Sequence, residues 1–369
     1  MKVLHVINRM SAGGAERLVM DLLRCHSAKG ISTDLMTLEE AESDFPSEEL
    51  PSAVRTYSSP VGRMRSPLQV RAIARASSSY DLVHAHLFPS QYWAALAQAI
   101  SGTPTITTEH NTFNERRRYR VLRPIERRIY SRFQRIVSVS HATEQSLRKW
   151  IELPKGRFEV IENGVDLRRF RSASRLERRA LHSNLADEDF LLIMVARFTR
   201  QKDQMTVLRS LAKLPSRFKL ALVGDGELLP EHRDAAHQMG VSERVLFLGR
   251  RTDVPRLLKT CDLAVLSSHW EGFGLAVVEA MAAGIPVLSS DVPGLADVVR
   301  GAGWLFGPGD TDGLASGILE IAGLPAEVRE KHLELQRLRA DRFDVDTTAN
   351  RYAALYLDIA ASKAERGGS

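Results

Sequence analysis

The sequence predicts an α/β protein made of two doubly wound, parallel-sheet domains. Its 369 residues exceed what one hydrophobic core usually holds, so two domains of about 150 to 200 residues are expected. Short apolar strand signals alternate with amphipathic helix signals along the chain, which is typical of parallel sheets with crossover helices. Glycine turns follow several of these strands, and ligands bind at the carboxyl ends of such strands.

The composition is that of an ordinary soluble globular protein, with 44% hydrophobic and 26% charged residues. The two cysteines, Cys25 and Cys261, lie far apart in apolar runs, which indicates reduced core residues and neither a disulfide framework nor a metal site. No apolar run reaches the length of about 18 residues that a membrane span needs, and residues 2–7 resemble a strand more than a signal sequence. We therefore expect a cytoplasmic protein that meets a membrane only at its surface.

In the first half of the chain, a buried strand at 3–7 is followed by Gly13 and Gly14 and by a helix at 15–28. Further strands are expected at 32–38, 53–57, 82–85, 105–108 and 136–140, and helices at 67–79, 90–100 and 141–149. His86 and His110 fall at the carboxyl ends of two of these strands. A histidine in such a place is either a satisfied structural residue or a catalytic one.

In the second half, a strand at 190–196 leads directly into Arg197, and Lys202 follows in the next loop. Both cations can reach one diphosphate, arginine as a bidentate fork and lysine as a point charge. The alternative is that both are ordinary surface charges. Strands are also expected at 220–223, 245–249, 263–266, 286–289 and 303–306, and helices at 204–214, 275–283, 311–322, 326–340 and 345–361.

The most informative stretch lies between Ser267 and Asp291. A strand ends at its start, a turn with Gly272 and Gly274 follows, and a helix begins near Leu275. The first N–H groups of a helix have no intrahelical partner and the helix dipole is positive there, so the turn predicts an anion site. Two glutamates, Glu271 and Glu279, flank this helix start eight positions apart, where a carboxylate can bind a ribose hydroxyl pair. A nucleotide diphosphate satisfies both features.

The run EGFGLAVVEAMAAGIPVLSSDVPG, which starts at Glu271, resembles the E-x7-E signature of the retaining glycosyltransferases of family four. The resemblance extends over nearly the full length of the chain. It implies the GT-B fold, in which two Rossmann-like domains face a cleft and the last helix crosses back to the first domain. It also implies transfer of a sugar, with retention of configuration, from a UDP- or GDP-sugar to a hydroxyl of a glycan or lipid-linked acceptor. Bacterial polysaccharide or glycoconjugate synthesis is the expected setting.

The same resemblance implies roles for particular residues. Its catalytic candidates are His110, beside the transferred sugar, and Glu271, on the sugar hydroxyls. Its donor-binding candidates are Gly13, Gly14, Arg197, Lys202, Arg250, Phe273, Gly274, Leu275 and Glu279. The nucleotide sugar is the donor substrate and no cofactor is required. The aspartate pairs at 187–189 and 344–346 have the spacing of a metal site but lie away from strand ends, so no metal is expected.

The domain division follows from the same pattern. We expect an acceptor-side domain at 1–166 together with the last helix at about 345–369, a polar linker at 167–189, and a donor domain at 190–344. Sequence alone keeps two other functions open. One is a sugar-nucleotide epimerase or hydrolase of the same fold, and the other is a non-catalytic protein that binds nucleic acid or a membrane.

That last alternative depends on one basic segment. Residues 111–135 contain nine arginines, all between Arg116 and Arg135, and only two glutamates. The segment is a solvated helix face with an apolar stripe that packs inward, a surface for anionic lipid or a pyrophosphate-linked acceptor, or a nucleic-acid surface. Nucleic acid ranks last, and is not expected as a partner, because no base-reading or stacking pattern accompanies the charge.

Overall fold

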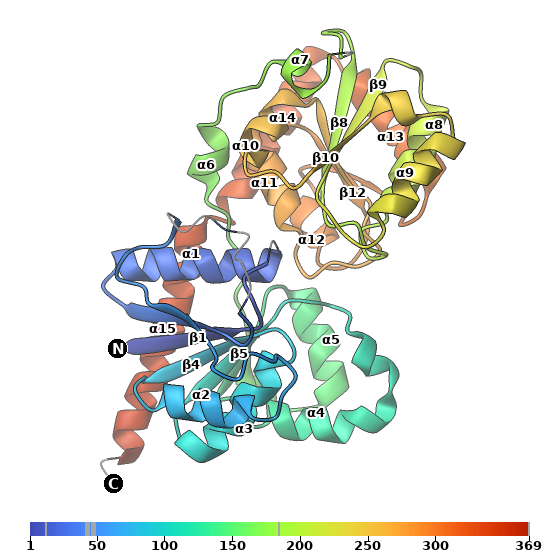
Figure 1. Ribbon diagram of the computed structural model, residues 1–369. Coiled ribbons are helices and arrows are strands. Elements are labelled where there is room, and N and C mark those ends of the chain that lie inside the picture. Colours follow the sequence, from blue (N-terminus) through green and yellow to red (C-terminus); the bar gives the residue numbers. More distant parts are fainter. Residues whose placement is uncertain (12, 41–44, 46–48, 184, 368–369) are drawn as a thin grey trace. The chain divides into compact units, whose positions relative to one another are not determined.

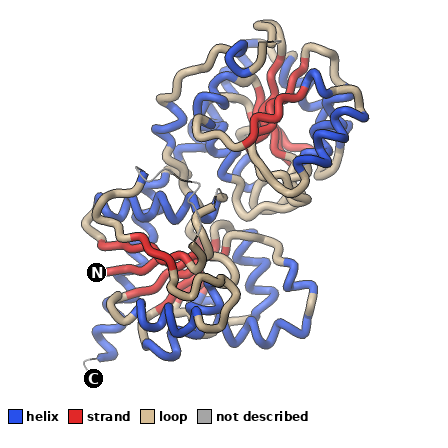
Figure 2. Tube along the Cα trace, viewed as in Figure 1, coloured by secondary structure: helices blue, strands red, loops and turns tan. Residues whose placement is uncertain are grey.

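The computed structural model describes the whole chain except residues 12, 41–44, 46–48, 184, 368 and 369, and it describes no side chain after residue 362. The chain forms two compact units (Figure 1). Unit 1 contains residues 1–164 and 345–369, and unit 2 contains residues 165–344. In each unit the strands lie in the centre and helices surround them (Figure 2). Both units are therefore layered α/β structures, as the sequence predicts.

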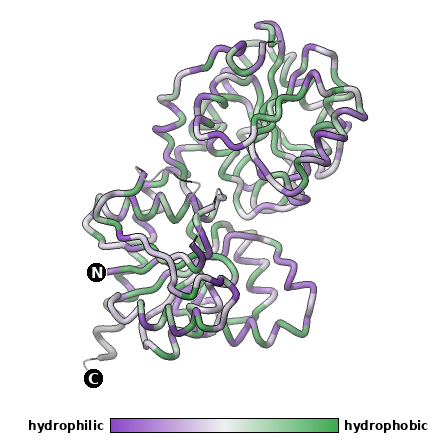
Figure 3. The backbone as a smooth tube through the Cα atoms, viewed as in Figure 1, coloured by the Kyte–Doolittle hydropathy of each residue, from purple (hydrophilic) through white to green (hydrophobic). Residues whose placement is uncertain are grey.

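Unit 1 is built on a seven-stranded sheet in the order β3-β2-β1-β4-β5-β6-β7, and all of its pairings are parallel. Its strands are β1 (Lys2–Ile7), β2 (Ser32–Thr37), β3 (Thr56–Ser58), β4 (Leu82–His86), β5 (Thr105–Glu109), β6 (Arg135–Ser138) and β7 (Phe158–Val160). The central strands are buried on both faces because helices cover both sides of the sheet. Figure 3 shows hydrophobic residues, in green, along strands of both units.

The longer helices of unit 1 are α1 (Gly14–Ala28), α2 (Gln69–Ser77), α3 (Ser90–Ser101), α4 (Arg123–Tyr130), α5 (His141–Ile151) and α15 (Val345–Gly367). On one face of the sheet, Val3 of β1 packs with residues of α1 and with Tyr352 and Tyr356 of α15. Leu4 and Val6, which point the other way along the same strand, pack with α2 and α3. The last helix thus returns to the first domain, as the fold class requires.

The start of α15 is held in place by close contact with the segment around Gly164. A Cβ on Gly164 would lie 2.6 Å from Oγ1 of Thr348 and 2.6 Å from Cα of Val345, so only glycine fits where the start of α15 passes this segment. Oγ1 of Thr348 also donates a hydrogen bond to the carbonyl of Glu162 at 2.9 Å. Both contacts tie the beginning of α15 to the end of the first segment of unit 1.

Unit 2 is built on a six-stranded parallel sheet in the order β10-β9-β8-β11-β12-β13. Its strands are β8 (Phe190–Val195), β9 (Phe218–Val223), β10 (Val245–Gly249), β11 (Leu263–Leu266), β12 (Val287–Ser290) and β13 (Trp304–Phe306). Its longer helices are α8 (Gln204–Lys213), α9 (Leu229–Gln238), α10 (Val254–Thr260), α11 (Leu275–Ala283), α13 (Thr311–Ala322) and α14 (Ala326–Asp341). A short helix, α12 (Ala296–Val299), follows the turn after β12.

Residues 167–189, which the sequence suggests as a linker, carry local structure of their own. They include the short helices α6 (Leu167–Arg171) and α7 (Arg178–Leu181), and they belong to unit 2. Leu167, Phe170 and Leu185 are buried. The segment therefore contributes apolar side chains to the packing of unit 2. No helix of the described residues is both long and apolar enough to cross a membrane.

Candidate active site

The candidate site of unit 2 starts at the carboxyl end of β11, at the turn that leads into α11. Gly274 ends this turn with a left-handed backbone, φ 92°, and α11 begins at Leu275. In the described residues, no side chain caps this helix and its first turn holds no acidic residue. The exposed N–H groups and the positive dipole end make the turn suitable for an anion such as a diphosphate.

Two glycines shape this turn by excluding side chains. A Cβ on Gly274 would lie 2.4 Å from Cδ1 of Leu295, and a Cβ on Gly294 would lie 2.5 Å from the carbonyl oxygen of Glu271. Gly294 is also left-handed, with φ 85°. The turn after β12 therefore packs directly against the turn before α11, which explains why the glycines of both turns are needed.

Glu271 and Lys202 are bonded to each other in unit 2. Nζ of Lys202 donates to Oε1 of Glu271, and Oγ of Ser268 donates to the same oxygen at 2.8 Å. The carboxylate is buried, with only 6% of the residue exposed. Ser267 in turn holds the backbone carbonyls of Lys202 and Asp203, at 3.0 Å and 2.8 Å. This network brings a cation and a carboxylate together beside the start of α11.

Arg197 follows β8, the strand next to β11 in the sheet, and is exposed. Its side chain forms no ion pair or hydrogen bond with any other residue that the structure describes, while Gln204 fixes its carbonyl at 2.9 Å. Glu279 is half-buried within α11. Arg250, just after β10, is exposed and lies 3.6 Å from Asp225. The guanidinium of Arg197 is thus available for a ligand.

The ring of Phe273 is buried in unit 2 and is not placed to stack on a ligand. Its side chain is 3% exposed and meets Phe343 edge-on, with ring centroids 5.1 Å apart. The ring belongs to the core of unit 2. Only the backbone of Phe273 is left for a ligand, beside those of Gly274 and Leu275.

The candidates of unit 1 lie at the carboxyl ends of β4 and β5, which are neighbours in the sheet. Nδ1 of His86 lies 3.3 Å from Nε2 of His110. His86 is fully buried and His110 is half-buried. Burial lowers the pKa of His110 to about 3, so its imidazole is neutral at physiological pH.

Gly13 and Gly14 lie at the start of α1, where Gly13 is the residue before the first helical turn. Glu16 occupies that first turn and accepts a hydrogen bond from Ser11 at 3.0 Å. A Cβ on Gly13 would meet the Glu16 carboxylate at 2.4 Å. Because a carboxylate already lies at this helix start, a second anion is less favoured there than at the start of α11.

Sequence reasoning missed two contributors. Ser268, which orients Glu271, lies three positions before it and is within reach of sequence analysis. His5 of β1 was not predicted either, yet its ring bonds to His86. That contact comes from strand pairing between segments far apart in the sequence, which no local pattern reports.

One group of described residues offers several metal-ligating atoms close together. His5, His84 and His86 each present a ring nitrogen, and these nitrogens lie within 4.8 Å of one another. Both nitrogens of His84, however, are already hydrogen-bonded, to Tyr356 and to Thr108, each at 2.7 Å. His5 and His86 bond to each other at 3.2 Å. Hydrogen bonds therefore account for this cluster.

Two family models match the chain, one on each half. The model described as Glycosyltransferase Family 4 matches residues 12–169, and the model described as Glycosyl transferases group 1 matches residues 178–334. Glycosyltransferase EpsF of Bacillus subtilis (strain 168) is 30% identical over 305 residues, which cover 79% of each chain. A galactosyltransferase of Escherichia coli, UDP-Gal:alpha-D-GlcNAc-diphosphoundecaprenol alpha-1,3-galactosyltransferase, is 25% identical over 77% of each chain.

Solved structures match the fold over almost the whole chain. Anabaena HepE in complex with UDP-glucose gives a TM-score of 0.84 at 24% identity and covers 97% of this chain and 100% of its own. Sucrose-phosphate synthase from Thermosynechococcus elongatus gives a TM-score of 0.84 at 22% identity, with 98% and 100% covered. The two parallel-sheet units are therefore those of a GT-B glycosyltransferase.

The chain belongs to glycosyltransferase family 4. It is an enzyme of the transferase class, and GT-B enzymes of this family are metal-independent. Asp187 and Asp189 have the spacing of a metal site, but they precede β8 and so lie at the amino ends of the strands. The start of α11 lies at the carboxyl ends, so these two aspartates are not part of the candidate site.

Proposed function

We propose that this enzyme transfers a sugar from a nucleotide-diphosphate sugar to a hydroxyl acceptor with retention of anomeric configuration. The arrangement at the start of α11 carries the proposal. An uncapped helix start, a carboxylate bonded to a lysine, and a second glutamate inside the helix match the needs of a diphosphate, a sugar and a ribose. UDP-sugars are the first donors to try, since HepE structures contain UDP or UDP-glucose and the Escherichia coli relative is named for UDP-Gal.

In this proposal unit 2 is the donor domain. Arg197 and Lys202 bind the diphosphate, together with the backbone N–H groups of residues 273–275. Glu279 accepts hydrogen bonds from the ribose, Glu271 binds hydroxyls of the donor sugar, and the backbone at Arg250 holds the base. Lys202 is bonded to Glu271 in the ligand-free chain. When the donor binds, this bond would break, so that Lys202 contacts the diphosphate and Glu271 contacts the sugar.

Unit 1 is the acceptor-side domain in this proposal. His110 contacts the transferred sugar, and Gly13 and Gly14 let the acceptor approach the backbone, while the donor phosphates bind at the start of α11. Retention does not need an enzyme nucleophile if the acceptor attacks from the face that the diphosphate leaves. The leaving phosphate then takes the acceptor proton, while Arg197 and Lys202 stabilise the negative charge that grows on it.

The acceptor is proposed to be a glycan or a lipid-linked glycan, as in bacterial polysaccharide or glycoconjugate synthesis. A surface of unit 1 supports membrane contact. The side chains of Tyr119, Val121 and Ile125 are exposed by 64%, 77% and 56%. Together with the exposed arginines Arg118, Arg120, Arg127 and Arg128 they form what we call the basic patch. Exposed apolar side chains and exposed arginines within one short segment suit a cytoplasmic enzyme that sits on an anionic membrane surface.

Not all of the basic segment belongs to that patch. Arg116 pairs with the buried Glu126 at 3.0 Å, and Arg117 pairs with the buried Glu109 at 3.4 Å. Ile129 packs in the core of unit 1 with Tyr130 and Phe133. The proposed membrane surface is therefore narrower than residues 116–135, because part of the segment is internal structure.

A donor screen tests the proposal. Nucleotide sugars with different bases and sugars are added singly, and the unfolding temperature is measured, since a ligand at 100 times its Kd adds roughly 2.7 kcal/mol to stability. The stabilising donor is then incubated with and without lipid-linked glycan acceptors. A product that forms only with acceptor, and keeps the anomeric configuration of the donor, supports the proposal. Conversion of the donor alone would favour an epimerase or a hydrolase instead.

A further inference from the structure

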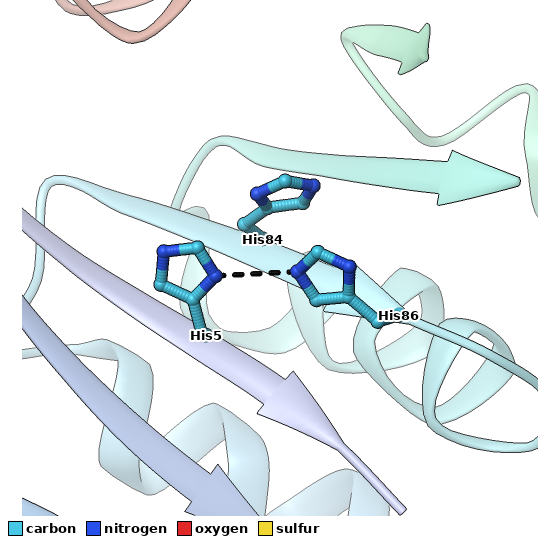
Figure 4. Close-up of side chains that lie close together, drawn as sticks. All are labelled: His5, His84 and His86. Carbon is cyan, nitrogen blue, oxygen red and sulfur yellow. Dashed lines mark hydrogen bonds between the residues drawn. The ribbon is translucent and has the colours of Figure 1, made fainter. Parts of the chain in front are cut away.

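Three histidines of unit 1 form a continuous hydrogen-bonded series. His84 and His86 are two residues apart in β4 and so lie on one face of the sheet, and the register of β1 places His5 beside His84. Nδ1 of His5 lies 3.2 Å from Nε2 of His86 (Figure 4). Nδ1 of His86 lies 3.3 Å from Nε2 of His110. The series therefore runs from the buried interior at His5 to the candidate catalytic residue His110.

All three rings of the series are neutral. Burial lowers the pKa of His5 and of His110 to about 3, and it holds the pKa of His86 well below its usual value. The titratable groups packed around them are His84 of β4, His26 of α1, and Tyr352 and Tyr356 of α15. Glu109, next to His110 in the chain, is bonded to Tyr130 and Arg117. No described carboxylate or cation pairs with the three rings.

Counting protons limits the series to two states. A neutral imidazole carries one proton, and each of the two hydrogen bonds needs one. If His86 is protonated on Nε2, then His5 and His110 are also protonated on Nε2, and Nδ1 of His110 is an acceptor. If His86 is protonated on Nδ1, then so are the other two, and Nδ1 of His110 is a donor. The rings change state together.

The far end of the series decides between these states. Nε2 of His5 is buried and has no hydrogen-bond partner among the described residues. In the first state this atom is a buried N–H without a protein acceptor, and in the second it is a lone pair without a donor. Nδ1 of His110, at the near end, also has no partner among the described residues, so each state leaves one N–H and one lone pair unpartnered. The unpartnered N–H lies on the fully buried His5 in the first state and on the half-buried His110 in the second. An N–H without a partner costs least where a ligand oxygen can reach it, so the second state is favoured, and it places a proton on Nδ1 of His110.

We propose that His5 and His86 are positioning residues that fix His110 as a neutral hydrogen-bond donor through Nδ1. Resting on the proposed function, this assigns that N–H to an oxygen of the transferred sugar. Nδ1 of His110 has no partner within the described residues, so it is the atom that remains for a ligand. His110 then holds the sugar by donating a hydrogen bond and does not accept the acceptor proton. His84, bonded to Tyr356 and Thr108, stands outside the series.

Nuclear magnetic resonance of the ligand-free enzyme tests the tautomers directly. With ¹⁵N-labelled histidine, two-bond ¹H–¹⁵N spectra distinguish protonated from unprotonated ring nitrogens. We expect His5, His86 and His110 all to carry the proton on Nδ1 at pH 7. The His86→Leu variant should release His110 from this state, so that its signals show the other tautomer or an exchanging mixture. A proton on Nε2 of His110 in the wild-type enzyme would overturn the proposal.

Kinetics of two substitutions at one position separate positioning from packing. In His86→Asn the side-chain amide takes the place of Nδ1–H and still donates to His110, whereas His86→Leu cannot. Loss of one neutral hydrogen bond is worth roughly tenfold in rate, so we expect kcat to fall about tenfold in His86→Leu and much less in His86→Asn. The KM for the nucleotide sugar should hardly change. Equal losses of kcat in both variants would contradict the proposal.

His26→Leu is the matched control, because His26 is as buried as His86 and, among the described residues, hydrogen-bonds only to the carbonyl of Ala349, at 2.9 Å. Its kcat should stay close to that of the wild type. The spectra are recorded without turnover, so they test the tautomer of His110 independently of the proposed glycosyltransferase activity. If the enzyme transfers sugar but His110 carries its proton on Nε2, the proposed function stands and the role of His5 and His86 is refuted. Stoichiometric zinc in the purified enzyme would also overturn it, since a metal between His5 and His86 would replace their hydrogen bond.

Discussion

The hydroxyl of Tyr356 lies 2.7 Å from Nδ1 of His84, and this hydrogen bond joins α15 to β4 across 272 residues of sequence. Both side chains are fully buried. The other nitrogen of His84 bonds to Thr108 at 2.7 Å, and Thr108 is also bonded to Tyr352 of α15 at 3.0 Å. The last helix is therefore joined to the first sheet by a polar network as well as by apolar packing.

Removing the Tyr356 hydroxyl tests this network. Tyr356→Phe keeps the ring but leaves Nδ1 of His84 buried without a partner, which costs about 1 to 3 kcal/mol. We expect hydrogen exchange of the α15 amides to become faster by the corresponding factor, because opening of α15 no longer breaks this bond. Tyr352→Phe is the control, since Thr108 keeps His84 as a partner and the effect should be smaller. Unchanged exchange in Tyr356→Phe would show that the bond contributes nothing.

Much of the fold could be predicted, because the spacing of apolar residues indicates the strands and helices and glycines indicate where many of them end. Strand β11 and helix α11 were predicted at their observed bounds, since apolar residues stop at Leu266 and left-handed glycines, Gly274 and Gly284, flank the helix. Helices α9 and α10 were not predicted. Helix α9 has a weak apolar face with only two buried residues, and α10 is only seven residues long. Packing against the sheet stabilises such segments, and sequence does not report it.

The buried histidines predict an acid-sensitive unit 1. Burial lowers the pKa of five of them, His5, His26, His84, His86 and His110, below the usual value of 6.5. The unfolded chain then binds more protons than the folded one below about pH 6.5, so stability falls as the pH falls toward about 3. Each such histidine adds roughly 1 kcal/mol of destabilisation per pH unit in this range.

We expect the unfolding temperature to drop steeply between pH 7 and pH 5. The His26→Gln variant should show a smaller drop over the same range, because one of the protons that favour unfolding is gone. Calorimetry at matched ionic strength measures both. A temperature of unfolding that stays level down to pH 5 would mean that these rings are not buried as neutral groups.

The cations of the donor site should act mainly on turnover. Arg197→Ala and Lys202→Ala each remove a charge that meets the leaving diphosphate, and we expect a loss of about 2 to 4 kcal/mol of transition-state stabilisation, or roughly 30- to 1000-fold in kcat. Donor binding, measured by calorimetry, should weaken less. Near wild-type turnover at saturating donor in both variants would refute the diphosphate assignment.

Lys213→Ala is the control for these variants. Lys213 also pairs with an acidic residue of unit 2, Asp312, but both side chains are exposed and lie on other helices. Its removal should leave kcat and donor affinity unchanged.

The Lys202–Glu271 pair could not be predicted as a contact, since 69 residues separate its partners and only the sheet brings them together. Sequence did predict each residue singly, through the resemblance to the family.

Backbone shape at the α11 start gives a further prediction. In Gly274→Ala the new methyl meets Leu295 at 2.4 Å and the residue keeps φ 92°, so both contact and strain oppose it. Gly301→Ala has a similar φ of 81° with nothing within 4 Å, and it measures strain alone, about 1 to 3 kcal/mol. We expect Gly274→Ala to be the less stable of the two, and to lose donor affinity. Equal stabilities would mean that the Leu295 contact is easily relieved.

The last prediction concerns the basic patch and the arginines beneath it. Replacing Arg118, Arg120, Arg127 and Arg128 with serine should leave stability within about 0.5 kcal/mol of the wild type, because these side chains are exposed. Replacing Arg116 and Arg117 instead leaves the carboxylates of Glu126 and Glu109 buried and without those cations. Breaking a buried pair costs about 3 to 5 kcal/mol, so this variant should be much less stable.

Binding to anionic vesicles then separates charge from insertion. Each arginine near an anionic surface contributes about 1 kcal/mol, screened over a Debye length of about 10 Å at 0.1 M salt. The four-serine variant should therefore stop sedimenting with anionic vesicles at low salt. In the wild type, part of the binding should survive higher salt, because Tyr119, Val121 and Ile125 insert apolar surface that salt does not screen. If the wild-type enzyme does not bind anionic vesicles at low salt, the membrane proposal is wrong, and these arginines instead contact the acceptor or the solvent.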